Sequence, residues 1–151
     1  MNHKSEGLNL KKLSREFLTE KELIFVGYSS RNQGFSKALY KGFMDNGIKV
    51  YPMNKNAGGT YDVKVYQSFD ELPNIPQTAF VLVNKEHAID AVKSLAEKGI
   101  KKVLFQTKRS VDEEVLGICK DAGMEVAIGC PMMLFGGGLH RFHGWIAGVK
   151  K

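Results

Sequence analysis

The sequence predicts an α/β fold in which five parallel strands form one open sheet with helices on both faces. Two observations predict it. In three places a helical pattern ends at a glycine and a strand pattern follows at once, at Gly47, Gly99 and Gly123. Glycine closes a helix because it adopts the left-handed conformation at little cost. Short apolar runs alternate with these helices, which is typical of strands buried on both faces of a parallel sheet.

Five apolar runs give the expected strands. Each is short and lies between helical or turn patterns, as a strand of a parallel sheet does. Strands that alternate with helices are joined by right-handed crossovers, so the resulting sheet is Rossmann-like. The expected strands are 23–27, 48–53, 79–83, 102–106 and 124–128.

Three helices are expected from apolar residues at helical spacing. The third begins after Ser110, because Ser110 and Glu113 have the spacing of a capping box. The expected apolar faces are Phe35, Ala38, Leu39, Gly42 and Phe43 in the first helix; Ala88, Ala91, Val92, Leu95 and Ala96 in the second; and Val115, Ile118, Cys119 and Ala122 in the third.

The predicted sheet accounts for a central domain of residues 21–135. Residues 1–20 are expected to add an N-terminal helix, with Leu10, Leu13, Phe17 and Leu18 on its apolar face. Residues 136–151 are expected to form a helical tail after a flexible joint of three glycines.

The segment between the second and third strands, residues 54–78, shows no pattern of a long helix. We expect only a short extended piece at 63–66 and a turn at 69–72.

Composition limits the class of protein. The 151 residues, 43% of them hydrophobic, suffice for one domain with its own core. The net charge of +6 favours anionic partners, but the basic residues are spread along the chain rather than massed in one block. Cys119 and Cys130 form neither a disulfide framework nor a zinc pattern. Without a signal-peptide core or an apolar run near the ~18 residues of a membrane span, we expect a cytoplasmic protein with no membrane partner.

The most informative stretch runs from Gly27 to Gly34, where the first expected strand breaks into a polar loop and then a helix. Parallel sheets bind ligands beyond the carboxyl ends of their strands, and the start of a helix favours anions, phosphates above all. Ser29 and Ser30 offer hydroxyls, and Arg31 offers a fork of donors. A steric role alone for the two glycines stays an alternative, because their spacing is not that of dinucleotide sites.

The residues after the second strand narrow the choice of phosphate ligand. An NAD site would have Asp or Glu there to bind the ribose hydroxyls. This chain has Met53, Asn54 and Lys55 instead, which suits an adenosine whose ribose carries a phosphate, as in NADP or coenzyme A. No G-K-[ST] motif is present, so a P-loop nucleotide triphosphatase is not expected.

Four segments together resemble the small stand-alone CoA-binding proteins of bacteria and, more distantly, the CoA-binding domain of the succinyl-CoA synthetase alpha subunit. The resemblance covers residues 20–131 and implies a Rossmann-like fold with coenzyme A or acyl-CoA as its ligand. The segments are 27–34, 51–55, 63–73 and 101–107.

The resemblance also implies a role for each loop. The pyrophosphate would lie on the loop after the first strand, the 3′-phosphate on Lys55, the adenine under the loop after the third strand, and the pantetheine arm along the turn after the fourth. For Lys55 and Lys108, an ordinary solvated surface lysine stays the alternative. The implied cofactor-binding residues are Gly27, Tyr28, Ser29, Ser30, Arg31, Gly34 and Lys37; Met53, Asn54 and Lys55; Val83, Asn84 and Lys85; and Thr107 and Lys108.

The chain departs from the synthetase pattern after the fifth strand, where it reads Gly129-Cys130-Pro131 instead of Gly-Pro-Asn-Cys. It also lacks the phosphohistidine domain and the nucleotide-binding partner domain, so we do not expect the ligase. No nucleophile, base and orienter can be assembled from the spacing, and we expect a binding module rather than an enzyme.

Some alternatives stay open. Cys130 lies where the thiol of a bound ligand would end, which predicts a mixed disulfide with CoA. His140 and His143 have no committed third ligand, so no metal is expected. The tail around Trp145 leaves a homodimer open. Lys55 also allows an NADP-binding oxidoreductase or redox sensor, and the positive charge alone allows a nucleic-acid binding protein, although no nucleic acid is our expectation.

Overall fold

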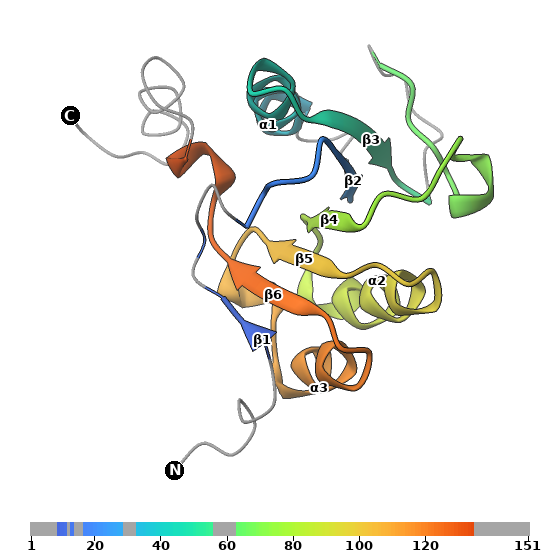
Figure 1. Ribbon diagram of the computed structural model, residues 1–151, viewed down its shortest axis with the longest axis vertical. Helices are drawn as coiled ribbons and strands as arrows, with labels where there is room; N and C mark the ends of the chain where they lie inside the picture. The colour runs from blue at the N-terminus through green and yellow to red at the C-terminus, as the bar shows by residue number, and fades with distance from the viewer. Residues whose placement is uncertain (1–8, 12, 14–16, 29–32, 56–62, 135–151) are drawn as a thin grey trace.

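In the computed structural model, residues 9–11, 13, 17–28, 33–55 and 63–134 are described. They form an all-parallel sheet of order β1-β6-β5-β4-β2-β3 (Figure 1). The strands are β1 (Asn9–Leu10), β2 (Glu22–Val26), β3 (Lys49–Met53), β4 (Thr78–Val81), β5 (Lys102–Phe105) and β6 (Glu125–Ile128). The helices are α1 (Gln33–Asp45), α2 (Lys85–Glu97) and α3 (Glu113–Asp121), and the short 3-10 helices are η2 (Phe69–Glu71), η3 (Lys108–Ser110) and η4 (Pro131–Met133).

The predicted parallel sheet is confirmed. All five expected strands are present, and the two-residue strand β1 joins them at the edge of β6. β2 lies between β3 and β4, so the chain leaves it toward one edge of the sheet and later returns to build the other. The ends of β2 and β4 therefore form the switch point at which ligands bind in sheets of this kind.

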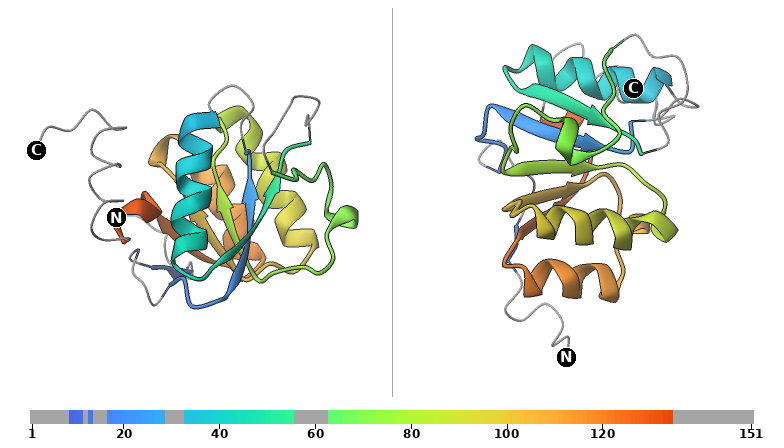
Figure 2. Two further views of the ribbon diagram at one scale, coloured as in Figure 1. Left: turned by 90° about the horizontal axis from the view of Figure 1, so that it is seen from above. Right: turned by 90° about the vertical axis from the view of Figure 1, so that its right-hand side faces the viewer.

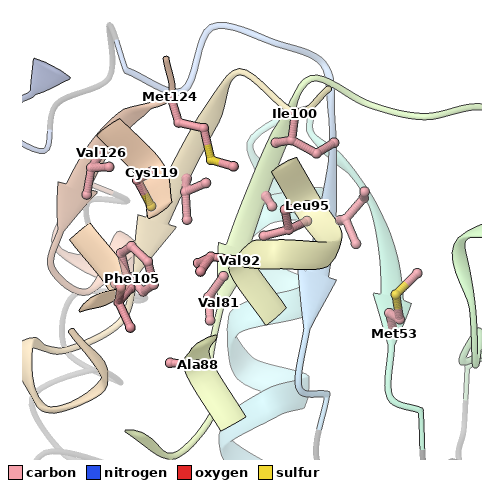
Figure 3. Close-up of a cluster of buried hydrophobic side chains, with 14 of the residues drawn as sticks. Met53, Val81, Ala88, Val92, Leu95, Ile100, Phe105, Cys119, Met124 and Val126 are labelled. Carbon is pink, nitrogen blue, oxygen red and sulfur yellow. The ribbon is translucent and has the colours of Figure 1, made fainter. Parts of the chain in front are cut away.

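Helices cover both faces of the sheet, as predicted (Figure 2). Leu39 and Phe43 of α1 pack on one face with Phe25 and Phe80, while Val92 and Leu95 of α2 pack on the other. Figure 3 shows the second cluster, where Cys119 of α3 and Met124 join α2 over the strands. No described helix is both long and apolar enough to cross a membrane.

The glycines predicted to end the helices do so. Gly47, Gly99 and Gly123 have φ values of +81°, +77° and +71°. The turn expected near residue 69 is η2, and the extended piece before it meets the sheet at Tyr66, which bridges to Met53. Periodicity and turn chemistry thus located these elements correctly.

Two local predictions are wrong. Ser110 is not the N-cap of α3, because residues 108–110 make a 3-10 turn and Asp112 occupies the cap position, its side chain accepting from Val115 N at 2.9 Å. Leu10 does not belong to a helix, because it pairs with Val126 in β1, where the edge of β6 offers free backbone groups. The predicted C-terminal tail, residues 136–151, lies outside the described residues.

A hydrogen-bonded cluster fixes the segment that follows η2. Tyr51 Oη donates to Glu22 Oε1 at 2.8 Å, and Asn74 Nδ2 donates to both carboxylate oxygens at 3.1 Å. The hydrogen bonds from Asn74 and Tyr51 lower the pKa of Glu22, while burial and the Glu22 carboxylate raise the pKa of Tyr51 to about 12. β2, β3 and the chain between η2 and β4 are joined by this cluster.

We expect Glu22→Gln to lower the free energy of unfolding at pH 7 by about 1 kcal/mol, since partial exposure reduces the value of a charged hydrogen bond. The folded pKa of Glu22 is below its unfolded value of 4.5, so its contribution is present above that unfolded value and is lost as the pH falls through the folded pKa. Urea denaturation at a series of acidic pH values should therefore show the difference between wild type and variant shrinking. Glu97→Gln, an exposed carboxylate of α2, serves as the control. A difference that is constant with pH would contradict the assignment.

Candidate functional site

A cavity of about 800 Å³ lies at the carboxyl ends of four neighbouring strands. Val26 and Gly27 line it from the end of β2, and Met53 from the end of β3. Leu82 and Val83 follow β4, and Thr107 follows β5. The cavity therefore occupies the switch point of the sheet, and its volume is in the range of small-molecule sites.

The turn after β2 is tied to the end of β3. Gly27 N and Tyr28 N both donate to Met53 O, at 2.8 and 3.2 Å. The side chain of Asn54 returns the contact, its Nδ2 donating to Tyr28 O at 2.9 Å. Because two strand ends hold it, the first turn of the predicted phosphate loop has a fixed position.

Gly27 also lies against the end of β4. Leu82 N donates to Val26 O at 2.9 Å, which draws the backbone after β4 toward the turn. Gly27 has φ of +94°, and a Cβ added to it would lie 2.1 Å from Leu82 O. Only a residue without a side chain fits between these two strand ends.

Helix α2 forms one wall of the cavity. His87, Asp90, Ala91 and Ser94 recur at helical spacing and present one face of the helix to it. The helix begins after Asn84, whose side chain makes no capping hydrogen bond.

The chain that leads into η2 also lines the cavity, through Gln67, Ser68 and the first residue of η2, Phe69. It is held at the edge of the sheet by Tyr66, which accepts from Asn54 N at 2.9 Å and donates to Pro52 O at 2.8 Å. This segment therefore lies beside the end of β3, at the edge of the sheet.

The charges around the cavity are mostly positive. Lys55, Lys85 and Arg109 line it, and Asp90 is the acidic member of the described lining. Clefts lined by one sign of charge concentrate ligands of the opposite sign. The cavity is therefore suited to an anionic ligand.

The structure brings eight of the predicted binding residues to this cavity. Ser29, Ser30 and Arg31 lie outside the described residues, so their predicted role stays a prediction. The eight residues are Gly27, Met53, Asn54, Lys55, Val83, Asn84, Lys85 and Thr107.

Four further predicted residues are not among the described residues that line the cavity. The ring of Tyr28 is 1% exposed and packs edge-on against Phe25, so its side chain belongs to the core. Gly34, Lys37 and Lys108 are exposed and are not among the lining residues. Backbone groups can also bind a phosphate, so the predicted binding role of these four residues stays a prediction.

Sequence reasoning missed Arg109 and four of the α2 residues that line the cavity: His87, Asp90, Ala91 and Ser94. The signal for α2 was present, because His87, Asp90 and Ser94 share a helical face. Arg109 differs from its neighbour Lys108 only through the 3-10 turn, in which Thr107 Oγ1 accepts from Arg109 N at 2.7 Å.

Cys130 lies just after β6, at the start of η4, and is partly buried. Burial raises the pKa of its thiol, although hydrogen bonds from Gln106 and the Met132 backbone act in the opposite direction. Cys130 is not among the described residues that line the cavity, so the mixed disulfide stays a prediction. The described residues include no cluster of metal ligands, and His140 and His143 lie outside them.

An open parallel sheet with a basic cavity at its switch point defines a cofactor-binding α/β domain of the kind that takes phosphorylated nucleotides. Comparison with known families is more specific. The CoA binding domain matches residues 21–135, and the chain belongs to that family. No curated protein matches.

Solved structures share the fold. A conserved hypothetical protein from Pyrococcus furiosus is 26% identical, with a TM-score of 0.62 over 73% of this chain and 94% of that one. A hypothetical protein from Pyrococcus horikoshii is 23% identical, with a TM-score of 0.68 over 81% and 89%. A dinucleotide-forming acetyl-coenzyme A synthetase of Ca. Korarchaeum cryptofilum is 19% identical, with a TM-score of 0.58 over 74% of this chain and 26% of that one.

Proposed function

We propose that this protein binds coenzyme A or acyl-CoA in the cavity at the strand ends and does not transform it. The diphosphate lies on the turn that follows Gly27, and Lys55 pairs with the 3′-phosphate. One observation carries the proposal: the basic cavity lies at the switch point of a chain that belongs to a CoA-binding family.

The order of the strand ends supports this arrangement. Across the sheet the strands follow one another as β3, β2, β4 and β5. Lys55 follows β3, Gly27 follows β2, Asn84 follows β4 and Thr107 follows β5. The 3′-phosphate at Lys55, the diphosphate at Gly27 and the pantetheine arm at Thr107 follow the order of these groups in CoA, and the loop at Asn84 closes over the adenine.

The proposal of binding without catalysis rests on what the cavity offers. Catalysis by a nucleophile needs a second group within hydrogen-bond reach that removes its proton, and a third that orients the second. Asp90 and Ser94 share a face of α2 with His87, but within the described part of the chain none of these side chains is hydrogen-bonded to another.

Thermal unfolding with a panel of ligands tests the proposal. We expect CoA and acetyl-CoA to raise the midpoint, while NADH, NADPH and a short DNA duplex do not. A ligand at about 100 times its dissociation constant adds ~2.7 kcal/mol, and for a chain of this size each kcal/mol shifts the midpoint by about 2–4 °C. Stabilisation by NADPH alone, or by no ligand of the panel, would contradict the proposed ligand.

The rate of acetyl-CoA hydrolysis tests the proposal that the protein does not transform its ligand. Acetyl-CoA incubated with the protein is expected to release free thiol no faster than in buffer, as measured with a thiol reagent. Faster release, lost on heating the protein, would show that it acts on its ligand.

A further inference from the structure

Arg109 lines the cavity at the β5 end, and the proposed function places the 3′-phosphate of CoA at the other end, beside Lys55. It lines the cavity from the turn after β5, whereas Lys55 lines it after β3. Two strands, β2 and β4, lie between β3 and β5. At about 4.8 Å for each step between neighbouring strands, the two positions are roughly 14 Å apart along the sheet edge.

The backbone holds Arg109 in this position. Thr107 Oγ1 accepts a hydrogen bond from Arg109 N at 2.7 Å and thereby caps the 3-10 turn η3. The turn brings Arg109 to the cavity, while Lys108 is exposed and is not a lining residue. Two adjacent basic residues therefore have different surroundings.

No described carboxylate neutralises Arg109, since the ion pairs among the described residues are Lys41 with Asp45, Lys98 with Asp70, and Lys102 with Glu20. Asp90 also lines the cavity but is not within ion-pair distance of the guanidinium. A guanidinium at the rim of a cavity, with its donors available, binds a carboxylate in a two-point geometry.

We propose that Arg109 makes this site selective for acyl-CoA whose acyl group ends in a carboxylate. The inference rests on the proposed function, which places the 3′-phosphate after β3 and the diphosphate after β2, and lays the pantetheine arm along the turn after β5. The thioester end then comes to the turn that carries Arg109. A terminal carboxylate gains a charged partner there, whereas a terminal methyl group gains none.

Isothermal titration calorimetry with matched ligands tests the selectivity. Malonyl-CoA and propionyl-CoA have the same number of acyl carbons and differ in a terminal carboxylate, as do glutaryl-CoA and valeryl-CoA, which extend the reach. For an arginine at a partly exposed site we expect the carboxylate ligand of at least one pair to bind about three- to tenfold more tightly. The preference should decrease as salt is added.

Arg109→Gln is expected to abolish the preference while unacylated CoA keeps its affinity, and Arg109→Lys to retain part of it. Lys120→Gln removes one positive charge from an exposed position in the last turn of α3 and should change nothing. Equal affinity within both pairs in the wild type would overturn this proposal alone. Equal weakening of all ligands, CoA included, by Arg109→Gln would also overturn it, since Arg109 would then hold a phosphate. Absence of binding by CoA itself would contradict the proposed function.

Discussion

Gly27→Ala is expected to destabilise the protein by about 2–5 kcal/mol. The left-handed conformation costs a residue with a side chain ~1–2 kcal/mol, and overpacking adds about 1–3 kcal/mol. The overlap is severe because the new Cβ would lie 2.1 Å from Leu82 O and 2.7 Å from Val83 Cγ1. Leu82 O belongs to the backbone that continues β4, so it cannot move away as a flexible side chain would.

Gly47→Ala is the matched control for this substitution. Gly47 has a similar φ of +81°, but a Cβ there meets nothing within 4 Å. Its substitution should therefore cost only the conformational part, ~1–2 kcal/mol. Urea denaturation of the two variants compares them directly, and CoA titration of the folded fraction reports on the site. Equal losses of stability would show that the approach of Gly27 to β4 is not a constraint on the fold.

The strand pattern that ends at Gly27 shows why the location of the cavity could be predicted from the sequence. The apolar run before Gly27 predicts a strand that ends at the residue, and parallel sheets bind ligands at that edge. The same rule predicts the ends of β3, β4 and β5, and Met53, Val83 and Thr107 all line the cavity. These predictions depend on topology alone, which strand and helix periods determine.

Side-chain direction in the loops could not be predicted in this way. Tyr28 follows Gly27, but its ring packs into the core, because the turn places it over Phe25. The 3-10 turn determines that Arg109, and not Lys108, lines the cavity. Because this turn occupies residues 108–110, the N-cap of α3 is Asp112 and not Ser110. These outcomes depend on one or two hydrogen bonds each, and no periodic pattern marks them.

The segment from Tyr66 to η2 shows a second limit of prediction from the sequence. The sequence predicts a short extended piece and a turn there, and both are present at Tyr66 and η2. That this segment lines the cavity follows only from the pairing of Tyr66 with Pro52 and Asn54, which is a long-range contact. A segment with little periodicity of its own thus becomes part of the site through its backbone.

Lys55→Gln is expected to weaken CoA by about tenfold and dephospho-CoA by much less. A charged pair with the 3′-phosphate at a partly exposed position corresponds to about 1–1.5 kcal/mol, which is close to a factor of ten. Lys55 is exposed and lines the cavity just after β3, next to Asn54, whose side chain is tied to the turn after β2. The backbone that carries Lys55 is therefore held in place, and its long side chain extends from there to the phosphate.

Calorimetry with both ligands on both proteins completes a thermodynamic cycle, which isolates the coupling between Lys55 and the 3′-phosphate from other effects of the substitution. Lys101→Gln is the control for net charge. This exposed lysine directly precedes β5, so it lies at the amino ends of the strands, whereas the cavity lies at their carboxyl ends. A general loss of positive charge would weaken both ligands in both variants, and the effect would decrease with salt. If Lys55→Gln weakens CoA and dephospho-CoA equally, Lys55 does not contact the 3′-phosphate, and its place at the cavity is that of a solvated surface lysine.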